Sequence, residues 1–110
     1  MIKMKLDADE IYREIMKAAE EWSKADDEAR NLKEMDRIIL AEITNQALGN
    51  SMAEKKSKAL ASPEYRLHVL RMVAAKTKAN IALAKYKAAQ SLADLRRSQE
   101  SSRRAEMNIR

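Results

Sequence analysis

The final 49 residues, Ser62–Arg110, read SPEYRLHVLRMVAAKTKANIALAKYKAAQSLADLRRSQESSRRAEMNIR and contain one proline and no glycine. Ser62 can cap a helix with its hydroxyl group. Pro63 suits the first helical position, where the missing N–H of proline has no cost. The stretch therefore predicts one long helix over residues 63–105, followed by a tail over residues 106–110.

Two series of apolar or small side chains run along this predicted helix at alternating steps of three and four. The first series, which we call the seam stripe, is Tyr65, His68, Met72, Ala75, Ala79, Ala82, Tyr86, Ala89 and Ala93. The second series, which we call the outer stripe, is Leu67, Leu70, Ala74, Thr77, Ile81, Ala84, Ala88, Ser91 and Leu95. A helix with one neighbour needs only one stripe, so the second stripe predicts a second neighbour.

The first half of the chain predicts a partner helix over residues 7–48. Asp7 and Glu10 have the spacing of a capping box at its start. A single stripe follows, which only Asp36 interrupts: Ile11, Ile15, Ala18, Trp22, Ala25, Ala29, Leu32, Ile39 and Ile43. Counting back from the turn places Trp22 near Tyr86 and Ala89. Gly49 is expected to end the helix in the left-handed conformation, and Ser51 with Glu54 predicts a short helix over residues 51–60.

These elements predict an all-α fold with a single helical domain over residues 1–110. We expect a long antiparallel helical hairpin, similar to a coiled coil, with a short connecting helix. Two long helices alone bury little surface in a chain of this size, so a second copy is the simplest neighbour for the outer stripe. The expected assembly is a dimeric four-helix bundle, with its interface at Leu67, Leu70, Ile81 and Leu95.

Charge is distributed unevenly along the chain. Residues 7–42 contain twelve acidic and six basic side chains, whereas residues 43–110 contain fourteen basic and five acidic ones. Five arginines, of which Arg110 is the last, lie within the final fifteen residues. Such a surface favours contact with the phosphate backbone of nucleic acid, although a basic face can also keep a chain in solution or pair with an acidic helix. The candidate contact residues are Lys85, Lys87, Arg96, Arg97, Arg103 and Arg104.

The sequence lacks the residues that several classes of enzyme and metal-binding protein require. The chain has no cysteine and one histidine, His68, which we interpret as a packing or surface residue because a zinc site needs more ligands. One glycine cannot make a phosphate-binding loop. We therefore expect no enzyme activity, metal or cofactor. Because no apolar run has the length of a signal peptide or membrane span, we also expect a cytoplasmic protein with no membrane partner.

The segments SLADLRRSQESSRRAEMNIR and ASPEYRLHVLRMV resemble a group of small helical proteins encoded by tailed bacteriophages. The resemblance rests on the Ser-Pro-x-Tyr start of the long helix and on Ser102-Arg103-Arg104-Ala105-Glu106 near its end. It implies a place among phage recombination and early genes, in the host cytoplasm. Two functions follow as hypotheses: an accessory protein whose basic helix end contacts nucleic acid or a nucleic-acid enzyme, or a module that binds and inhibits a host protein such as a nuclease or defence complex.

Overall fold

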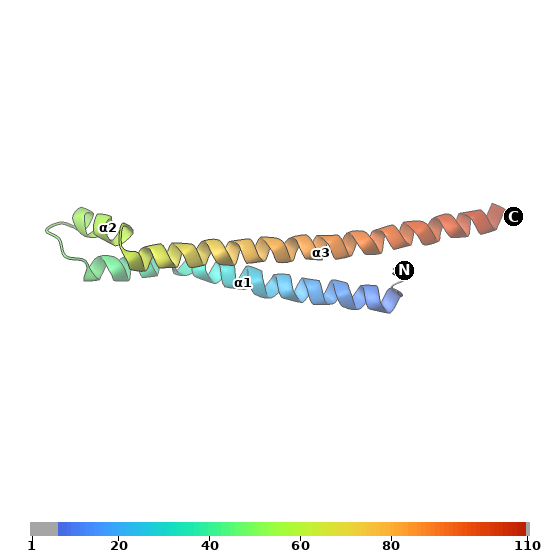
Figure 1. Cartoon of the computed structure of the whole chain (residues 1–110), viewed down its shortest axis with the longest axis horizontal. Coiled ribbons are helices and arrows are strands. Elements are labelled where there is room, and N and C mark those ends of the chain that lie inside the picture. Colours follow the sequence, from blue (N-terminus) through green and yellow to red (C-terminus); the bar gives the residue numbers. More distant parts are fainter. Residues whose placement is uncertain (1–6, 110) are drawn as a thin grey trace. The chain divides into compact units, whose positions relative to one another are not determined.

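The computed structural model describes residues 7–109, which form three helices and no strand. Helix α1 spans Ala8–Gln46, α2 spans Met52–Leu60 and α3 spans Pro63–Ile109 (Figure 1). The prediction of an all-α helical hairpin with a short connecting helix is confirmed. Within the described part of the chain, no helix has the length and apolar content needed to cross a membrane.

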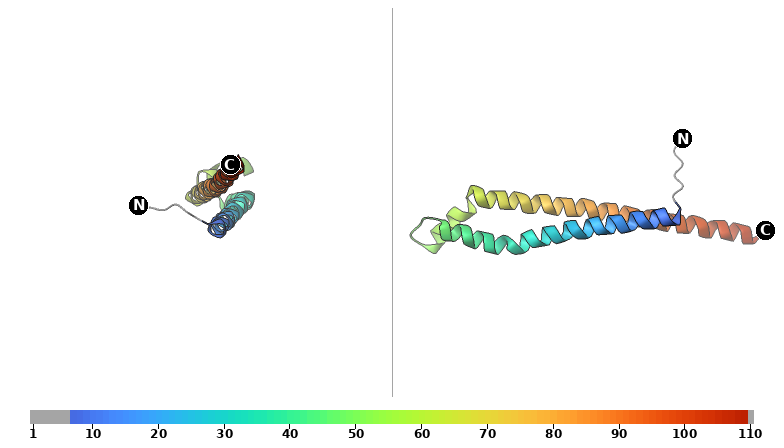
Figure 2. Two further views of the ribbon diagram at one scale, coloured as in Figure 1. Left: turned by 90° about the vertical axis from the view of Figure 1, so that its right-hand side faces the viewer. Right: turned by 90° about the horizontal axis from the view of Figure 1, so that it is seen from below.

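Residue contacts group the chain into two compact units. One unit contains the described residues of Met1–Ser23 and Asn80–Arg110, and the other contains Lys24–Ala79. In each unit a segment of α1 lies beside a segment of α3 and runs in the opposite direction (Figure 1, Figure 2). The second unit also contains α2 and both turns.

The start of α1 follows the prediction, but its end does not. The backbone N–H of Glu10 donates to Asp7 Oδ1 at 2.8 Å, which confirms Asp7 as the cap. Helix α1 ends at Gln46, two residues earlier than predicted. Gly49 does not adopt a positive φ, so the prediction of a left-handed residue there is wrong. A Cβ atom at Gly49 would lie 3.2 Å from Lys55 Cγ and 3.3 Å from Glu54 Cγ, so the position favours a small residue.

Helix α2 is fixed to the turn before it by side chains at both of its ends. Ser51 Oγ accepts from the backbone N–H of Glu54 at 3.1 Å, as the capping box predicts. The carboxylate of Glu54 accepts from the N–H of Asn50 at 3.0 Å, one residue before the predicted donor. Lys58 Nζ donates to the carbonyl oxygen of Leu48 at 2.7 Å. These bonds hold the turn in a shape that needs no left-handed residue.

Helix α3 begins as predicted and ends later. Ser62 Oγ accepts from the backbone N–H of Tyr65 at 3.2 Å, and Pro63 is the first helical residue. The helix continues to Ile109, four residues beyond the predicted end, so residues 106–109 are helical instead of a tail. Arg110, the last of the five arginines, lies outside the described residues.

The interior consists of small side chains. The buried apolar residues are Ile11, Ala25, Ala59, Ala75 and Ala79. All residues of the predicted α1 stripe and of the seam stripe of α3 are buried or half-buried. Alanine on both sides lets two helices approach closely. The rings of Trp22 and Tyr86 stack with centroids 5.6 Å apart, which confirms the predicted pair.

Candidate functional site

The basic side chains near the end of α3 form more than one surface. Successive residues of an α-helix are about 100° apart around its axis. Lys85, Arg96 and Arg103 therefore share one face within about 20°. Arg97 and Arg104 share a neighbouring face about 100° away. Lys87 follows Lys85 by two residues and lies nearly opposite it, so the helix does not bring all six predicted contact residues together.

Carboxylates on the same helix already engage two of these arginines. Arg97 Nη2 lies 2.5 Å from Asp94 Oδ1, three residues earlier. Arg96 Nε lies 3.4 Å from Glu100 Oε1, four residues later. Neither Arg103 nor Arg104 has an ion-pair partner within residues 7–109, and both are exposed. Of the four described arginines at this end of α3, only Arg103 and Arg104 are thus left without an ion pair among residues 7–109.

The end of α3 extends beyond the start of α1 (Figure 1, Figure 2). Residues 101–108 are all exposed, and both helix segments belong to the same compact unit. The exposure of residues 101–108 means that no described side chain of α1 buries Arg103 or Arg104. An incoming phosphate could approach these two side chains from most directions around the helix.

The outer stripe of α3 is a second exposed surface. All nine of its residues are exposed, including the four predicted interface residues. Leu67 and Leu70 belong to one compact unit, and Ile81 and Leu95 belong to the other. The neighbouring Val73 and Leu92 are also exposed. Within a single chain the outer stripe is thus uncovered in each unit, as the prediction of a second neighbour requires.

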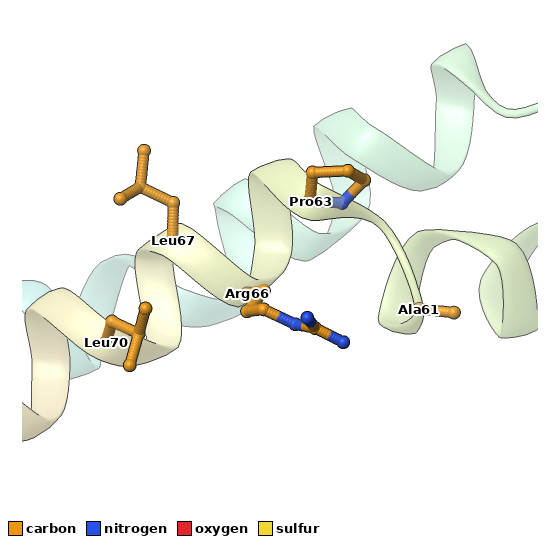
Figure 3. A pocket seen from close by; sticks show the side chains of 5 residues that line it. All are labelled: Ala61, Pro63, Arg66, Leu67 and Leu70. Atoms are coloured by element: carbon orange, nitrogen blue, oxygen red, sulfur yellow. The ribbon is translucent and has the colours of Figure 1, made fainter.

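An open hollow of about 330 Å³ lies where α2 turns into α3. Its lining residues are Ala61, Pro63, Arg66, Leu67 and Leu70 (Figure 3). Figure 3 shows Leu67 and Leu70 projecting from the first turns of α3, with Arg66 between Leu70 and Ala61. The lining is mostly apolar and open to solvent, so it suits an apolar side chain from another molecule.

One polar cluster joins α1 to α3 in the interior, and the sequence did not predict it. Tyr65 Oη donates to Asp36 Oδ1 at 3.0 Å. His68 Nε2 lies 3.1 Å from the same oxygen, within ion-pair distance, but the geometry there does not make a hydrogen bond. His68 is only 5% exposed. The interruption of the α1 stripe at Asp36 was the available signal, because a carboxylate at a seam position needs a polar partner on the facing helix.

The surroundings of the Tyr65 phenol in this cluster change its pKa. The hydrogen bond to Asp36 raises the pKa of Tyr65, and burial and the negative charge of Asp36 raise it further. Tyr65 is therefore neutral and able to donate at physiological pH, as an unperturbed tyrosine also is. The cluster thus aligns α1 with α3, which agrees with the interpretation of His68 as a packing residue.

The remaining acidic residues do not form a metal-binding centre in the described part of the chain. Asp26 Oδ2 accepts from Arg30 Nη2 at 2.9 Å within α1, and Glu28 Oε2 lies 3.7 Å from Lys78 Nζ on α3. Within the described residues, no group of three histidine, cysteine or acidic residues could hold a metal ion.

Comparison with known proteins gives no relative: no protein-family model, curated protein or solved structure matches this chain. The geometry therefore defines the class as an all-α helical hairpin with an exposed apolar stripe and a basic helix end.

Proposed function

We propose that this chain is a non-enzymatic phage accessory protein that acts in nucleic-acid transactions such as recombination or replication. The basic end of α3 contacts nucleic acid, or an enzyme bound to nucleic acid. The observation that carries this proposal is the exposure of Arg103 and Arg104 on a continuous helix, with no ion-pair partner within residues 7–109. The phage assignment rests on the resemblance of the helix start and end to phage proteins.

The contact is to the backbone and is independent of base sequence. Arg96 and Arg103 are seven residues apart, or about 10 Å along the helix, and Arg97 and Arg104 repeat that spacing on the neighbouring face. No aromatic side chain lies between Lys87 and Ile109 to stack on bases. Arginines on a preformed helix lose less conformational freedom on binding than arginines on an unfolded tail would lose.

A homodimer forms part of the proposal. A folded monomer of 12.6 kDa is expected to expose about 6,200 Å² of surface, whereas this chain exposes 9,307 Å². The difference, about 3,100 Å², is well above the roughly 800 Å² that each partner buries in a standard interface. Two copies also present the basic helix end twice, which strengthens a weak contact through effective concentration. The proposed location is the cytoplasm of the host cell.

A second candidate function is inhibition of a host protein, such as a nuclease or a defence complex. The exposed outer stripe favours this second function, because a large exposed apolar patch marks an interaction site. In this case the stripe binds the host protein, and the basic end of α3 only affects the rate of association.

A shortened chain that ends at Glu100 tests the first function. It keeps the two ion pairs at Arg96 and Arg97 and removes Arg103 and Arg104. We expect unchanged helicity per residue by circular dichroism, and affinity for duplex DNA at low salt at least tenfold weaker than that of the full chain. Equal affinity of the two chains would contradict the assignment of DNA binding to the end of α3. Specific capture of a host protein after nuclease treatment, together with no affinity for DNA, would support the second function.

A further inference from the structure

The two stripes of α3 lie on nearly opposite sides of the helix. Each outer-stripe residue follows a seam-stripe residue by two positions, as Leu70 follows His68 and Thr77 follows Ala75. Two positions correspond to about 200° of rotation, or about 160° by the shorter way. The seam stripe faces α1 and is buried or half-buried throughout, whereas the outer stripe is exposed throughout. A neighbour on the outer stripe therefore packs on the side of α3 that faces away from α1.

Helix α1 has no comparable stripe on the side opposite its packed stripe. The residues that follow its stripe, or the interruption at Asp36, by two positions are Arg13, Lys17, Glu20, Lys24, Asp27, Asn31, Glu34, Ile38, Ala41 and Asn45. Eight of these ten are charged or amide side chains. The outer stripe of α3 contains no charged residue, and its two polar members, Thr77 and Ser91, carry small hydroxyl groups. The face opposite the packed stripe is therefore mostly polar on α1 and free of charge on α3, which favours α3 over α1 as the surface for a further helix.

We propose that a second copy of this chain packs on the outer stripe of α3, so that the two α3 helices form the centre of the dimer and the α1 helices lie outside them. This inference rests on the proposed homodimer and specifies its interface. It specifies that the four-helix bundle expected from the sequence is joined through the outer stripes of the two α3 helices. The outer stripe, which contains Leu67, Leu70 and Ile81, advances in alternating steps of three and four residues. This spacing packs knobs into holes between two helices.

The exposed surface of the chain is large enough for a second copy to bind. The chain exposes 9,307 Å², about 3,100 Å² more than a folded monomer of its mass. An interface of standard size, about 800 Å² from each copy, takes about a quarter of that excess. The hollow lined by Pro63, Leu67 and Leu70 supplies a recess at one end of the outer stripe for an apolar side chain of the second copy.

Two isoleucines of nearly equal exposure provide a matched test. Ile81 lies in the outer stripe of α3 and is 54% exposed, and Ile38 lies on α1 and is 56% exposed. Ile81→Glu should raise the dissociation constant of the dimer about a hundredfold or more, because each dimer loses two buried isoleucines. Ile38→Glu, which adds the same charge, should leave the constant within about threefold of the original value. Sedimentation velocity over a range of concentrations measures both.

The absence of cysteine permits a direct map of the interface. Single cysteines placed at each outer-stripe position of α3 and at each outer position of α1 are oxidised mildly, and dimers are counted on a non-reducing gel. A disulfide forms only where two Cα atoms come within about 7 Å. We expect disulfide dimers from at least one α3 position, such as Ala74 or Ala88, whether the helices run parallel or antiparallel, and none from α1 positions such as Asn31.

Each other outcome rejects the inference in a recognisable way. Dimers joined through α1 positions alone would keep the proposed homodimer and reject the α3 seam. A chain that sediments as a monomer at high concentration would reject both the seam and the homodimer. If that monomer binds a foreign protein through Ile81, the outer stripe is a surface for a different partner. None of these results depends on DNA binding, which the shortened chain tests separately.

Discussion

Replacing Tyr65 with phenylalanine removes a half-buried hydrogen bond that joins α3 to α1. The bond joins Tyr65 Oη to Asp36 Oδ1 at 3.0 Å, and the acceptor is a carboxylate. A hydrogen bond to a charged group contributes about 1.5–3 kcal/mol. The Asp36 side chain is 30% exposed, so water can replace part of the lost bond. We therefore expect Tyr65→Phe to lower the free energy of unfolding by about 1–2 kcal/mol at pH 7.

The same variant gives a pH dependence with a defined sign. The hydrogen bond to Asp36, burial and the charge of Asp36 raise the pKa of Tyr65 in the folded chain. In the unfolded chain a tyrosine titrates near pH 10. The stability that this bond contributes is therefore fully present below about pH 10, and it is lost as the pH rises through the folded-state pKa. The difference in stability between the natural chain and Tyr65→Phe should shrink toward zero above that pH.

Urea unfolding monitored by circular dichroism at pH 7, 9 and 11 measures both effects, with every chain at one concentration because a dimer gains stability by mass action. Tyr12→Phe is the control, since Tyr12 is 63% exposed, and it should change stability by less than about 0.5 kcal/mol at any of these pH values. Equal stability of Tyr65→Phe and the natural chain at pH 7 would refute the role of the cluster. A difference that persists undiminished at pH 11 would refute the pH account.

Two further substitutions test the packing and the turn. Trp22→Ala should cost about 2–3 kcal/mol, less than a fully buried tryptophan, because the ring stacks on Tyr86 but is only half-buried; a cost below about 0.5 kcal/mol in urea unfolding would show that the stack contributes little. Gly49→Ala should change the free energy of unfolding by less than about 1 kcal/mol. Gly49 has no positive φ, so alanine fits the backbone. The close contact of the new Cβ with Glu54 and Lys55 is destabilising, and the lower conformational entropy of the unfolded chain offsets it. A loss well above that value would indicate a conformation that only glycine adopts.

The sequence predicted most of the elements because their signals are local. Asp7, Ser51 and Ser62 each accept the capping bond expected of them. The steps of three and four identified both stripes of α3, and the exposure of each stripe agrees with its assigned place. Counting residues from the turn was enough to pair Trp22 with Tyr86, because both helices continue without a break.

The errors came from features that depend on neighbours. Gly49 can adopt either sign of φ, and the turn is fixed by Glu54 and Lys58, whose reach is not visible in local sequence. The predicted helix ended at residue 105, whereas α3 continues to Ile109. Ion pairs at Arg96 and Arg97 support the helix there, since such pairs at helical spacing stabilise a helix by about 0.2–0.5 kcal/mol each.

The candidate sites also include features that local sequence predicts and features that depend on neighbouring elements. The exposure of Arg103 and Arg104 agrees with the sequence, because no described residue covers either side chain. The separation of Lys85 from Lys87 follows from helical rotation, which a count of basic residues ignores. The cluster of Asp36, Tyr65 and His68 needed the register between two helices, which no single stretch of sequence contains.

The salt dependence of DNA binding tests the central claim most directly. Binding of a labelled duplex is measured by fluorescence anisotropy from low to moderate salt for three chains: the natural chain, Arg103→Gln/Arg104→Gln, and Lys17→Gln/Arg37→Gln, which removes the same charge from exposed positions of α1. Glutamine preserves helix propensity. Each lost phosphate contact lowers the slope of log K against log salt by about 0.9. The account predicts a slope shallower by about 1.8 for each bound α3 end in the first variant, and an unchanged slope in the second. Equal slopes for all three chains, or no binding by the natural chain at low salt, would contradict it.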